Sequence, residues 1–196
     1  MRKLIVTNIV SLDGYYEGPG NNVMVLPMDS FFDAYNAERL RSAGTLLLGR
    51  RTYEGFKSFW PPVAGDPAYP PVLREISELN NAIEKVVVSN SLTPDQTAPW
   101  TDTTRILRRQ DAHERIRELK RGDGGDILIF GSRTLWNDLL VARMVDELHL
   151  MVGAAVLGDG TRAFTGEKTP PLRLIDTRSV EDSDNVLVRY DAGSVA

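Results

Sequence analysis

The chain has 196 residues, of which 42% are hydrophobic and 26% are charged, a balance typical of one folded domain over residues 1–196. The net charge of −4 excludes the overall basic field that recruits nucleic acid. The absence of cysteine excludes disulfides and thiolate metal sites. No apolar stretch approaches the roughly 20 residues of a membrane span, and none near residue 1 has the form of a signal peptide. The composition predicts a soluble, cytoplasmic protein that binds neither nucleic acid nor membranes.

Strand patterns alternate with helix patterns along the chain. In chain order, the predicted elements are a strand 3–10, a helix 30–42, a strand 45–48, a helix from Thr52, a helix 71–82, strands 85–89 and 104–108, a helix 111–121, a strand 126–130, a helix 134–142, a strand 146–152 and a pair of strands 171–178 and 185–190. Five prolines between residues 60 and 71 predict a surface excursion within the domain. The alternation predicts the α/β class, with a mostly parallel sheet, helices on both faces and an antiparallel hairpin at the end.

Three of the predicted strands end in small or polar residues. These ends are Gly49-Arg50-Arg51-Thr52, Ser89-Asn90-Ser91 and Gly131-Ser132-Arg133-Thr134. In open parallel sheets, ligands bind beyond the carboxyl ends of the strands. We therefore take the three ends as candidate parts of one ligand site.

The run that begins at Gly49 has the chemistry of a phosphate site. Glycine lets the backbone turn tightly, and the free N–H groups at the start of the following helix attract phosphate. Arg50 and Arg51 add positive charge and forked donors, and the Thr52 hydroxyl either caps the helix or bonds a phosphate oxygen. The same residues also fit a glycine turn with a threonine cap and two solvated arginines, so both interpretations stay open.

The run from Gly131 to Thr134 repeats this pattern. Ser132, Arg133 and Thr134 open a second helix, whose backbone amides have the chemistry to hold a pyrophosphate. The run is not the GxGxxG fingerprint of dinucleotide-binding folds. Leu135 follows in the first turn and starts the apolar face of this helix. Two glycine-led helix starts in one sheet favour the phosphate interpretation more than either does alone.

Several segments of the sequence resemble the dihydrofolate reductase-like family. They are LLLGRRTYEGF (46–56), VVVSNSL (86–92), ILIFGSRTLWNDLL (127–140) and VDELHLMVGAAVLGDGTRAF (145–164), in the order of that family. SLDGYYEGP (11–19) resembles the first-strand loop of its stand-alone branch, which is related to the reductase domain of riboflavin biosynthesis. The resemblance covers nearly the whole chain.

The resemblance implies a fold, a cofactor and a set of contacts. The fold is a single, mainly parallel sheet of about eight strands with a reversed last strand, the cofactor is NADPH, and the protein is a homodimer. The resemblance places Arg50, Arg51 and Thr52 at the adenosine phosphates, Ser89 and Asn90 at the adenine ribose, Gly131, Ser132 and Thr134 at the pyrophosphate, and Val10, Ser11 and Gly14 at the nicotinamide. Gly49, Arg133 and Leu135 complete the implied cofactor-binding residues.

The sequence departs from the riboflavin-pathway reductases at the places that hold their substrate. Those proteins usually carry an arginine directly after SLDG, an Asp-Asp-Pro segment after the second strand and a Glu-Gly-Gly at the fifth. This chain has Tyr15, the GRRTYEGF run and Phe130-Gly131-Ser132 there. The residues expected to hold a ribityl phosphate are therefore missing, and the substrate stays open.

Two aspartates are candidates for the catalytic proton donor. LPMD (26–29) has the form of the Leu-Pro-x-Asp segment in which dihydrofolate reductases place their acid, so Asp29 is one candidate, although aspartate is also a preferred helix cap. Asp13 is the other, and it either serves the nicotinamide region or forms an ordinary Asp-Gly turn. His149 either makes structural hydrogen bonds on its strand or faces the cleft. Two histidines and no cysteine predict no metal site.

These observations predict an NADPH-dependent reductase that transfers a hydride to a C=N or C=O bond of a small flat heterocycle, similar to a pterin or an aminopyrimidine. Tyr15, Tyr16 and Trp60 are candidates to line the pocket for such a ring, or else to pack in the core. Two alternatives stay open. One is a nucleotide- or flavin-binding protein without turnover that uses the same cleft, and the other is a dimeric interaction protein with a vestigial site.

Overall fold

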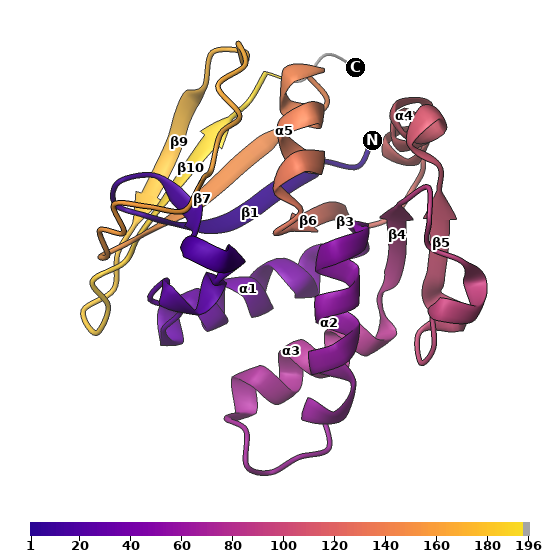
Figure 1. The fold of residues 1–196 in the computed structure, drawn as a ribbon, viewed down its shortest axis with the longest axis horizontal. Coiled ribbons are helices and arrows are strands. Elements are labelled where there is room, and N and C mark those ends of the chain that lie inside the picture. The colour runs from indigo at the N-terminus through magenta and orange to yellow at the C-terminus, as the bar shows by residue number, and fades with distance from the viewer. Residues whose placement is uncertain (194–196) are drawn as a thin grey trace.

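Residues 1–193 build one eight-stranded sheet and a separate two-stranded pair (Figure 1). The computed structural model describes residues 1–193. The strands are β1 (Leu4–Ser11), β2 (Tyr15–Glu17), β3 (Ala43–Gly49), β4 (Glu84–Val88), β5 (Thr104–Leu107), β6 (Asp126–Phe130), β7 (Glu147–Gly153), β8 (Thr161–Arg162), β9 (Arg173–Arg178) and β10 (Val186–Asp191). The large sheet has the order β5-β4-β3-β6-β1-β7-β10-β9, and β10 runs in the direction opposite to the other strands. The predicted α/β fold, with its antiparallel hairpin at the end, is confirmed.

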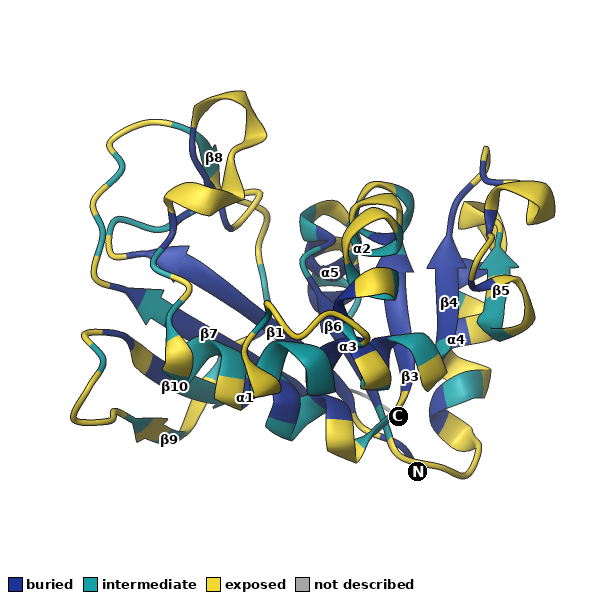
Figure 2. Cartoon of the chain, turned by 90° about the horizontal axis from the view of Figure 1, so that it is seen from below, coloured by how far each residue is buried: buried dark blue, intermediate teal, exposed yellow. Residues whose placement is uncertain are grey.

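Within residues 1–193, five α-helices cover the two faces of the sheet. They are α1 (Ser30–Ser42), α2 (Arg50–Val63), α3 (Pro71–Ala82), α4 (Ala112–Arg121) and α5 (Arg133–Val141). The first three pack on one face, where Tyr53 and Ile76 meet Leu46. The other two pack on the opposite face through residues such as Ile116 and Trp136. None of these helices combines the length and the apolar run that a membrane crossing needs. Figure 2 shows the result, with a buried centre at β1 and β3 and an exposed edge at β9.

The start of the predicted surface excursion is wrong, because α2 continues through Pro61 and Pro62 in its last turn. A proline lacks the N–H that would continue the helix ladder, so the local sequence predicts an end here. The neighbouring α3 compensates, since the Ser77 hydroxyl donates to the Trp60 carbonyl and accepts from the Ala64 N–H. The other predicted elements begin and end within about two residues of the observed ones.

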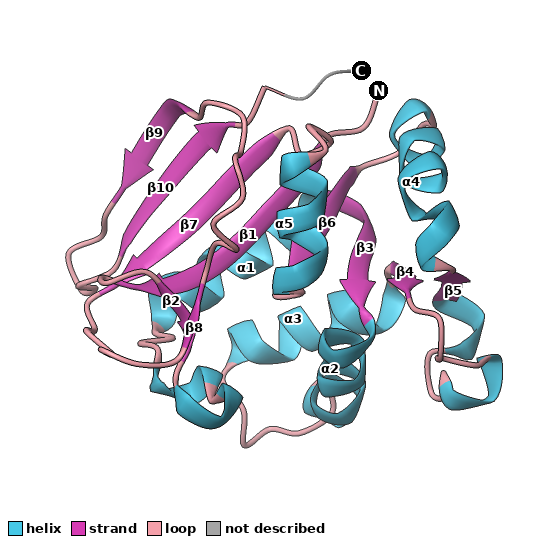
Figure 3. Cartoon of the chain, turned by 45° about the horizontal axis from the view of Figure 1, so that its top comes forward, coloured by secondary structure: helices cyan, strands magenta, loops and turns pink. Residues whose placement is uncertain are grey.

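β3 and β6 are neighbours in the sheet, yet the helices that follow them go to opposite faces. α2 leaves β3 toward the face of α1 and α3, whereas α5 leaves β6 toward the face of α4. Parallel sheets open a crevice at such a switch point, beyond the carboxyl ends of the strands. β1 widens it, because its pairing with β6 ends at Thr7↔Phe130 while β1 continues to Ser11. In Figure 3, β1 and β3 diverge toward this edge.

A polar cluster is buried between β7 and α1, away from that edge. The His149 side chain is fully buried, with Nδ1 2.8 Å from the Tyr35 hydroxyl and Nε2 2.8 Å from a Glu147 carboxylate oxygen. Burial lowers the pKa of His149 to about 4, which keeps the ring neutral at physiological pH. His149 therefore makes the structural hydrogen bonds that were one of its two predicted roles.

Candidate functional site

A cleft of about 1520 Å³ opens at the carboxyl ends of β1, β3 and β6, at the switch point of the sheet. Two groups of residues form its sides. The first group, the cationic wall, consists of residues 49–52, Arg109 and residues 131–134. The second group, the apolar wall, consists of Val23, Met24, Leu26, Met28, Phe32, Asp33, Asn36, Leu40, Phe56, Phe59, Trp60, Leu73, Ile76 and Asn80. Thr7, Asn8 and Ile9 of β1 line the cleft, as do Tyr16 and Glu17 of β2.

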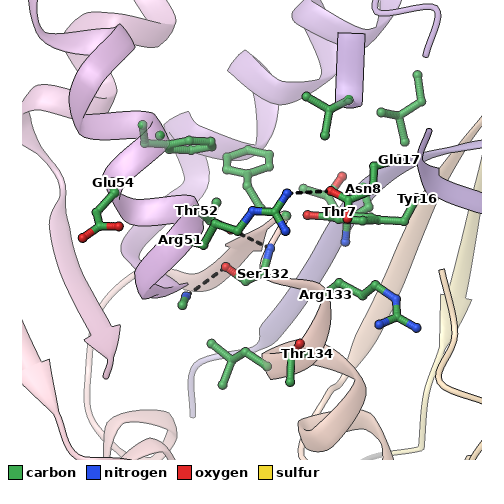
Figure 4. Close-up of a pocket in the computed structure, with 18 of the residues that line it drawn as sticks. Thr7, Asn8, Tyr16, Glu17, Arg51, Thr52, Glu54, Ser132, Arg133 and Thr134 are labelled. Atoms are coloured by element: carbon green, nitrogen blue, oxygen red, sulfur yellow. Dashed lines mark hydrogen bonds and ion pairs between the residues drawn. The ribbon is translucent and has the colours of Figure 1, made fainter. Parts of the chain in front are cut away.

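The cationic wall is built from the first turns of α2 and α5. Gly49 precedes α2 and Ser132 precedes α5, and neither residue caps its helix with a side-chain hydrogen bond. Two other bonds join the helix starts, because the Ser132 N–H donates to the Thr52 hydroxyl and the Gly49 N–H donates to the Ser132 hydroxyl, each at 2.9 Å. Figure 4 shows both bonds. The pairing brings two positive helix ends to one place, which is the requirement for binding a diphosphate.

Gly131 is required at its position by both space and conformation. Its φ is +55°, in the left-handed region that favours glycine. A Cβ atom there would lie 2.9 Å from the Tyr16 hydroxyl and 3.0 Å from the Thr52 Cγ2. Tyr16 and Thr52 therefore fill the space that a side chain would take, and only glycine fits between the two helix starts.

Four arginines line this wall; the Arg133 guanidinium donates to the Arg162 and Phe164 carbonyls, and the other three bring their positive charge to the cleft in different ways. Arg50 is held by Glu54 at 2.7 Å and by the Ser91 hydroxyl at 2.6 Å. Arg51 reaches toward the two-stranded pair and bonds Glu17 at 3.0 Å, as Figure 4 shows. Within residues 1–193, the Arg109 guanidinium has no ion pair or hydrogen bond of its own. All three are available to an anion, Arg109 without breaking any contact.

The apolar wall is formed by matching stripes on two helices. On α1 the stripe is Asp33, Asn36 and Leu40, and on α3 it is Leu73, Ile76 and Asn80. Both follow the spacing i, i+3, i+7 that places side chains on one side of a helix. The aromatic residues of α2 complete the wall, with the Phe59 and Trp60 rings 4.9 Å apart in an edge-to-face arrangement. This side of the cleft suits a flat, apolar ring.

Asp33 is the functional candidate that the sequence prediction missed. Its carboxyl group lies in the apolar wall, and burial together with the nearby charge of Asp29 raises its pKa to about 6. An acid with that pKa exchanges protons near neutral pH, which is the property of a general acid. The available signal was its spacing, since Asp33 lies one turn after Asp29 on the predicted helix. That signal was weak, because nothing local tells which side of the helix faces a cleft.

Two buried amides also face the cleft with unused hydrogen-bonding groups. Asn8 is 7% exposed and Asn80 is 1% exposed. Within residues 1–193, the Asn8 Nδ2 and the Asn80 Oδ1 have no hydrogen-bond partner. The orientation of Asn80 is set by its other atom, because its Nδ2 donates to the Ile76 carbonyl at 2.9 Å. Buried polar atoms are nearly always paired in folded proteins, so these two atoms are candidates for contact with an ordered water or a ligand.

The family model described as RibD C-terminal domain matches residues 2–188. The chain belongs to this family. The predicted resemblance to the riboflavin-related branch of the dihydrofolate reductase-like proteins is thereby confirmed.

Three relatives place this family member among known proteins. It is 27% identical over 179 residues to the uncharacterized protein YyaP of Bacillus subtilis (strain 168), covering 91% of this chain and 89% of YyaP. It superposes with a TM-score of 0.67 on a Thermotoga maritima diaminohydroxyphosphoribosylaminopyrimidine deaminase/5-amino-6-(5-phosphoribosylamino)uracil reductase, at 13% identity, covering 97% of this chain and 56% of that one. The TM-score to the Enterococcus faecalis dihydrofolate reductase complexed with NADP(H) and RAB-propyl is 0.57, at 17% identity over 96% and 95% of the two chains. At these identities, the two structures establish the fold alone.

Val10, Ser11 and Gly14, the residues predicted at the nicotinamide, do not line the cleft. Val10 packs in the core, and the Ser11 hydroxyl is 2.6 Å from Asp13 while it accepts from the Tyr15 N–H. Gly14 turns the loop with a φ of +83°. The lining at β1 is made instead by the preceding residues 7–9.

The two predicted acids are occupied by structural contacts. Asp13 accepts from the Ser11 hydroxyl and from the N–H groups of Gly158 and Leu157, which together lower its pKa to about 2. Asp29 caps α1 by accepting from the Phe32 N–H, and it also accepts from Ser183. Both carboxylates lie outside the cleft lining, which contains Asp33 instead.

The remaining predicted residues divide between the cleft and its support. Arg133, Thr134 and Leu135 line the cleft. Ser89 and Asn90 shape the turn after β4: the Ser89 hydroxyl accepts from the Leu92 N–H, and the Asn90 side chain accepts from the Arg109 N–H at 2.9 Å. This turn lies outside the lining, but its bond to Arg109 holds a cation that is part of it.

Proposed function

We propose that this protein is an NADPH-dependent reductase that transfers a hydride to a C=N or C=O bond of a small flat heterocycle. The observation that carries the proposal is that the two uncapped, glycine-led helix starts converge on the same cleft as an apolar wall with one acid. Membership in the RibD C-terminal domain family supports a reductase. The relation of fold to a dihydrofolate reductase complexed with NADP(H) supports the cofactor.

The residues of the cationic wall fit a phosphorylated dinucleotide. The free N–H groups of α2 and α5 suit the pyrophosphate, because both helices begin at this wall of the cleft. Arg50 and Arg109 suit the extra phosphate of NADPH, because guanidinium groups bind phosphate through paired hydrogen bonds. When bound, NADPH supplies the hydride.

The chain supplies the proton at Asp33. A C=N or C=O bond that accepts a hydride also needs a proton on its nitrogen or oxygen, and a protonated carboxyl group in an apolar wall is suited to deliver it. The raised pKa of about 6 keeps a fraction of Asp33 protonated at neutral pH. Asp13 is less suited, because its pKa of about 2 leaves it ionised. The proposal therefore assigns the proton to Asp33 and structural roles to Asp13 and Asp29.

Titration of the full-length protein with NADPH and with NADH, followed by intrinsic tryptophan fluorescence, tests the cofactor. We expect saturable quenching, with tighter binding of NADPH. Absence of binding by either nucleotide at millimolar concentration would overturn the proposal.

Oxidation of bound NADPH in the presence of pterins, aminopyrimidines and other flat heterocycles tests turnover. We expect loss of the reduced-nicotinamide absorbance with at least one compound, and none with Asp33→Asn. Tight NADPH binding without oxidation by any compound would favour the alternative of a nucleotide-binding protein without turnover. Tighter binding of a flavin than of NADPH would favour a flavin-binding protein.

A further inference from the structure

The order of the strands gives the parts of the cofactor different places along the cleft. Arg50 and Arg109, which suit the extra phosphate, follow β3 and β5, and the uncapped start of α5 follows β6. A dinucleotide with its phosphorylated ribose at these arginines and its pyrophosphate at the helix starts continues in the same direction across the sheet. The next strand is β1, which lines the cleft with residues 7–9. The nicotinamide half of the cofactor therefore belongs at β1.

The two faces of β1 serve different parts of the cleft. Successive side chains of a strand point to opposite sides of its sheet. Val10 packs with Trp136 of α5, whereas Ile9 packs with Tyr35 of α1. Asn8 lies two residues before Val10, so its side chain is on the side of α5. The apolar wall comes from the helices of the opposite face. Asn8 is therefore the polar side chain that β1 directs toward the cofactor half of the cleft.

Asn8 carries a hydrogen-bonding group that the protein itself leaves unused. The residue is 7% exposed, and its Nδ2 has no hydrogen-bond partner among residues 1–193. The positions two residues away on the same side of the strand, Val6 and Val10, are apolar. A buried amide without a partner costs folding free energy that an apolar side chain in its place does not cost. A ligand that supplies the missing acceptor offsets this cost.

The nicotinamide ring carries one group with the matching chemistry, its carboxamide. That group has a carbonyl acceptor and an NH₂ donor, the same pair that an asparagine side chain has. The two amides are therefore complementary in either orientation of the asparagine amide. The phosphates of the cofactor are acceptors as well, but the helix starts and the arginines attract them to the ends of β3, β5 and β6.

From these observations we infer that Asn8 recognises the nicotinamide carboxamide, with its Nδ2 donating to the carbonyl oxygen of that group. The inference rests on the proposed function, because it takes NADPH as a ligand of the cleft. A bond to the carboxamide fixes the rotation of the ring about its link to the ribose, and so decides which face of the ring meets a substrate. Asn8 thus replaces Val10, Ser11 and Gly14 as the contact with the nicotinamide.

Calorimetry on the full-length protein with two ligands tests this assignment. NADPH carries the nicotinamide, and 2′-phospho-ADP-ribose is the matching molecule without it. Asn8→Leu keeps the branched shape of the side chain and removes both of its hydrogen-bonding groups. We expect this variant to bind NADPH about fivefold to tenfold more weakly, as the loss of one hydrogen bond predicts. The affinity for 2′-phospho-ADP-ribose should not change.

A further ligand and a smaller variant identify the interacting group. In the thionicotinamide analogue of NADPH, sulfur replaces the carboxamide oxygen and is a weaker acceptor. The unchanged protein should prefer NADPH over this analogue by more than Asn8→Leu does, because the variant lacks the bond that distinguishes the two ligands. Asn8→Ala should behave in the same way, and it leaves more room for the ring than leucine does. Circular dichroism establishes that both variants are folded.

The inference is overturned by two results. One is that both variants bind NADPH as tightly as the unchanged protein, which is expected where Asn8 holds only an ordered water. The other is an equal loss for NADPH and 2′-phospho-ADP-ribose, because a merely structural effect weakens both ligands. Failure of the proposed function is a different result: the unchanged protein then does not bind NADPH, or binds it and oxidises it with no compound.

Discussion

The two walls of one cleft follow opposite electrostatic designs. The cationic wall presents uncapped helix starts and arginines, so its positive potential comes from the backbone and from long, solvated side chains. The apolar wall presents helix sides and aromatic rings around the single carboxyl group of Asp33. Water still solvates the charges of the cationic wall. In the apolar wall, burial disfavours the ionised form of the acid and so raises the pKa of Asp33.

This difference shows how one cleft at the switch point of the sheet can bind both phosphate groups and a flat apolar ring. The cationic wall uses the ends of helices, where N–H groups are free, whereas the apolar wall uses their sides, where side chains are packed. β1 contributes Asn8 to the lining of the same cleft, and its Nδ2 has no hydrogen-bond partner among residues 1–193. Variants on either wall should therefore have separable effects on cofactor and substrate.

The largest expected effect comes from the apolar wall. Asp33→Asn keeps the shape but removes the proton, so we expect turnover to fall about 10²- to 10³-fold, within the usual range for a general acid. In the unchanged protein, turnover should decline as the pH rises above about 6, because the proton leaves Asp33. Steady-state rates across pH measure both effects. Unchanged NADPH affinity in the variant is the control, and a wild-type pH profile in Asp33→Asn would remove Asp33 from catalysis.

The second prediction concerns the pH dependence of stability, to which Asp33 and the buried His149 should contribute with opposite signs. The pKa of His149 falls from 6.5 to about 4 on folding, so the unfolded chain binds more protons between these values, and stability drops as the pH falls through them. A shift of this size corresponds to about 3 kcal/mol. Asp33 has the opposite sign, because its pKa rises from 3.8 to about 6, so it destabilises the fold as the pH rises through that window.

Urea unfolding between these pH values tests the two signs. We expect His149→Gln to flatten the loss of stability toward acid pH and Asp33→Asn to steepen it. Parallel changes in the two variants would mean that the two groups do not titrate as their surroundings indicate.

On the cationic wall, the double variant Arg50→Ala/Arg109→Ala should weaken NADPH binding about 100-fold, since hydrogen bonds to charged groups contribute roughly 1.5–3 kcal/mol each. NADH binding should fall much less, because only NADPH carries the additional phosphate. Arg117→Ala/Arg121→Ala, on the exposed side of α4, is the matched control for charge. Equal losses for NADPH and NADH would show that the arginines do not distinguish the two cofactors.

The smallest effect concerns the turn that opens the cationic wall. Gly131→Ala combines a positive φ with close contacts to Tyr16 and Thr52, and we expect a loss of about 2 kcal/mol in stability. Gly166→Ala is the matched control, because its φ is +85° and its Cβ would meet nothing within 4 Å. It should lose about 1 kcal/mol from the backbone alone. Chemical unfolding measures both losses. Equal losses would mean that Tyr16 and Thr52 move aside from the new Cβ atom without a cost in stability.

Much of the fold was predictable because its signals are local. The apolar, β-branched runs predicted every strand of the large sheet, and the two glycine-led helix starts were visible in four residues each. The two prolines of α2 misled the prediction, because the hydrogen bonds of Ser77 that support the helix end come from α3. A partner distant in sequence leaves no mark in the local pattern.

The sequence by itself determined the class of the fold and the chemistry of the two helix starts, because both depend on residues within a turn or a strand of each other. Tertiary structure alone decided which residues meet at the cleft. The adjacency of β3 and β6 brought Gly49 and Ser132 together. The rotation of α1 turned Asp33 toward the cleft and left Asp29 as a cap. These outcomes depend on how helices pack on the sheet, and packing is set by the whole core.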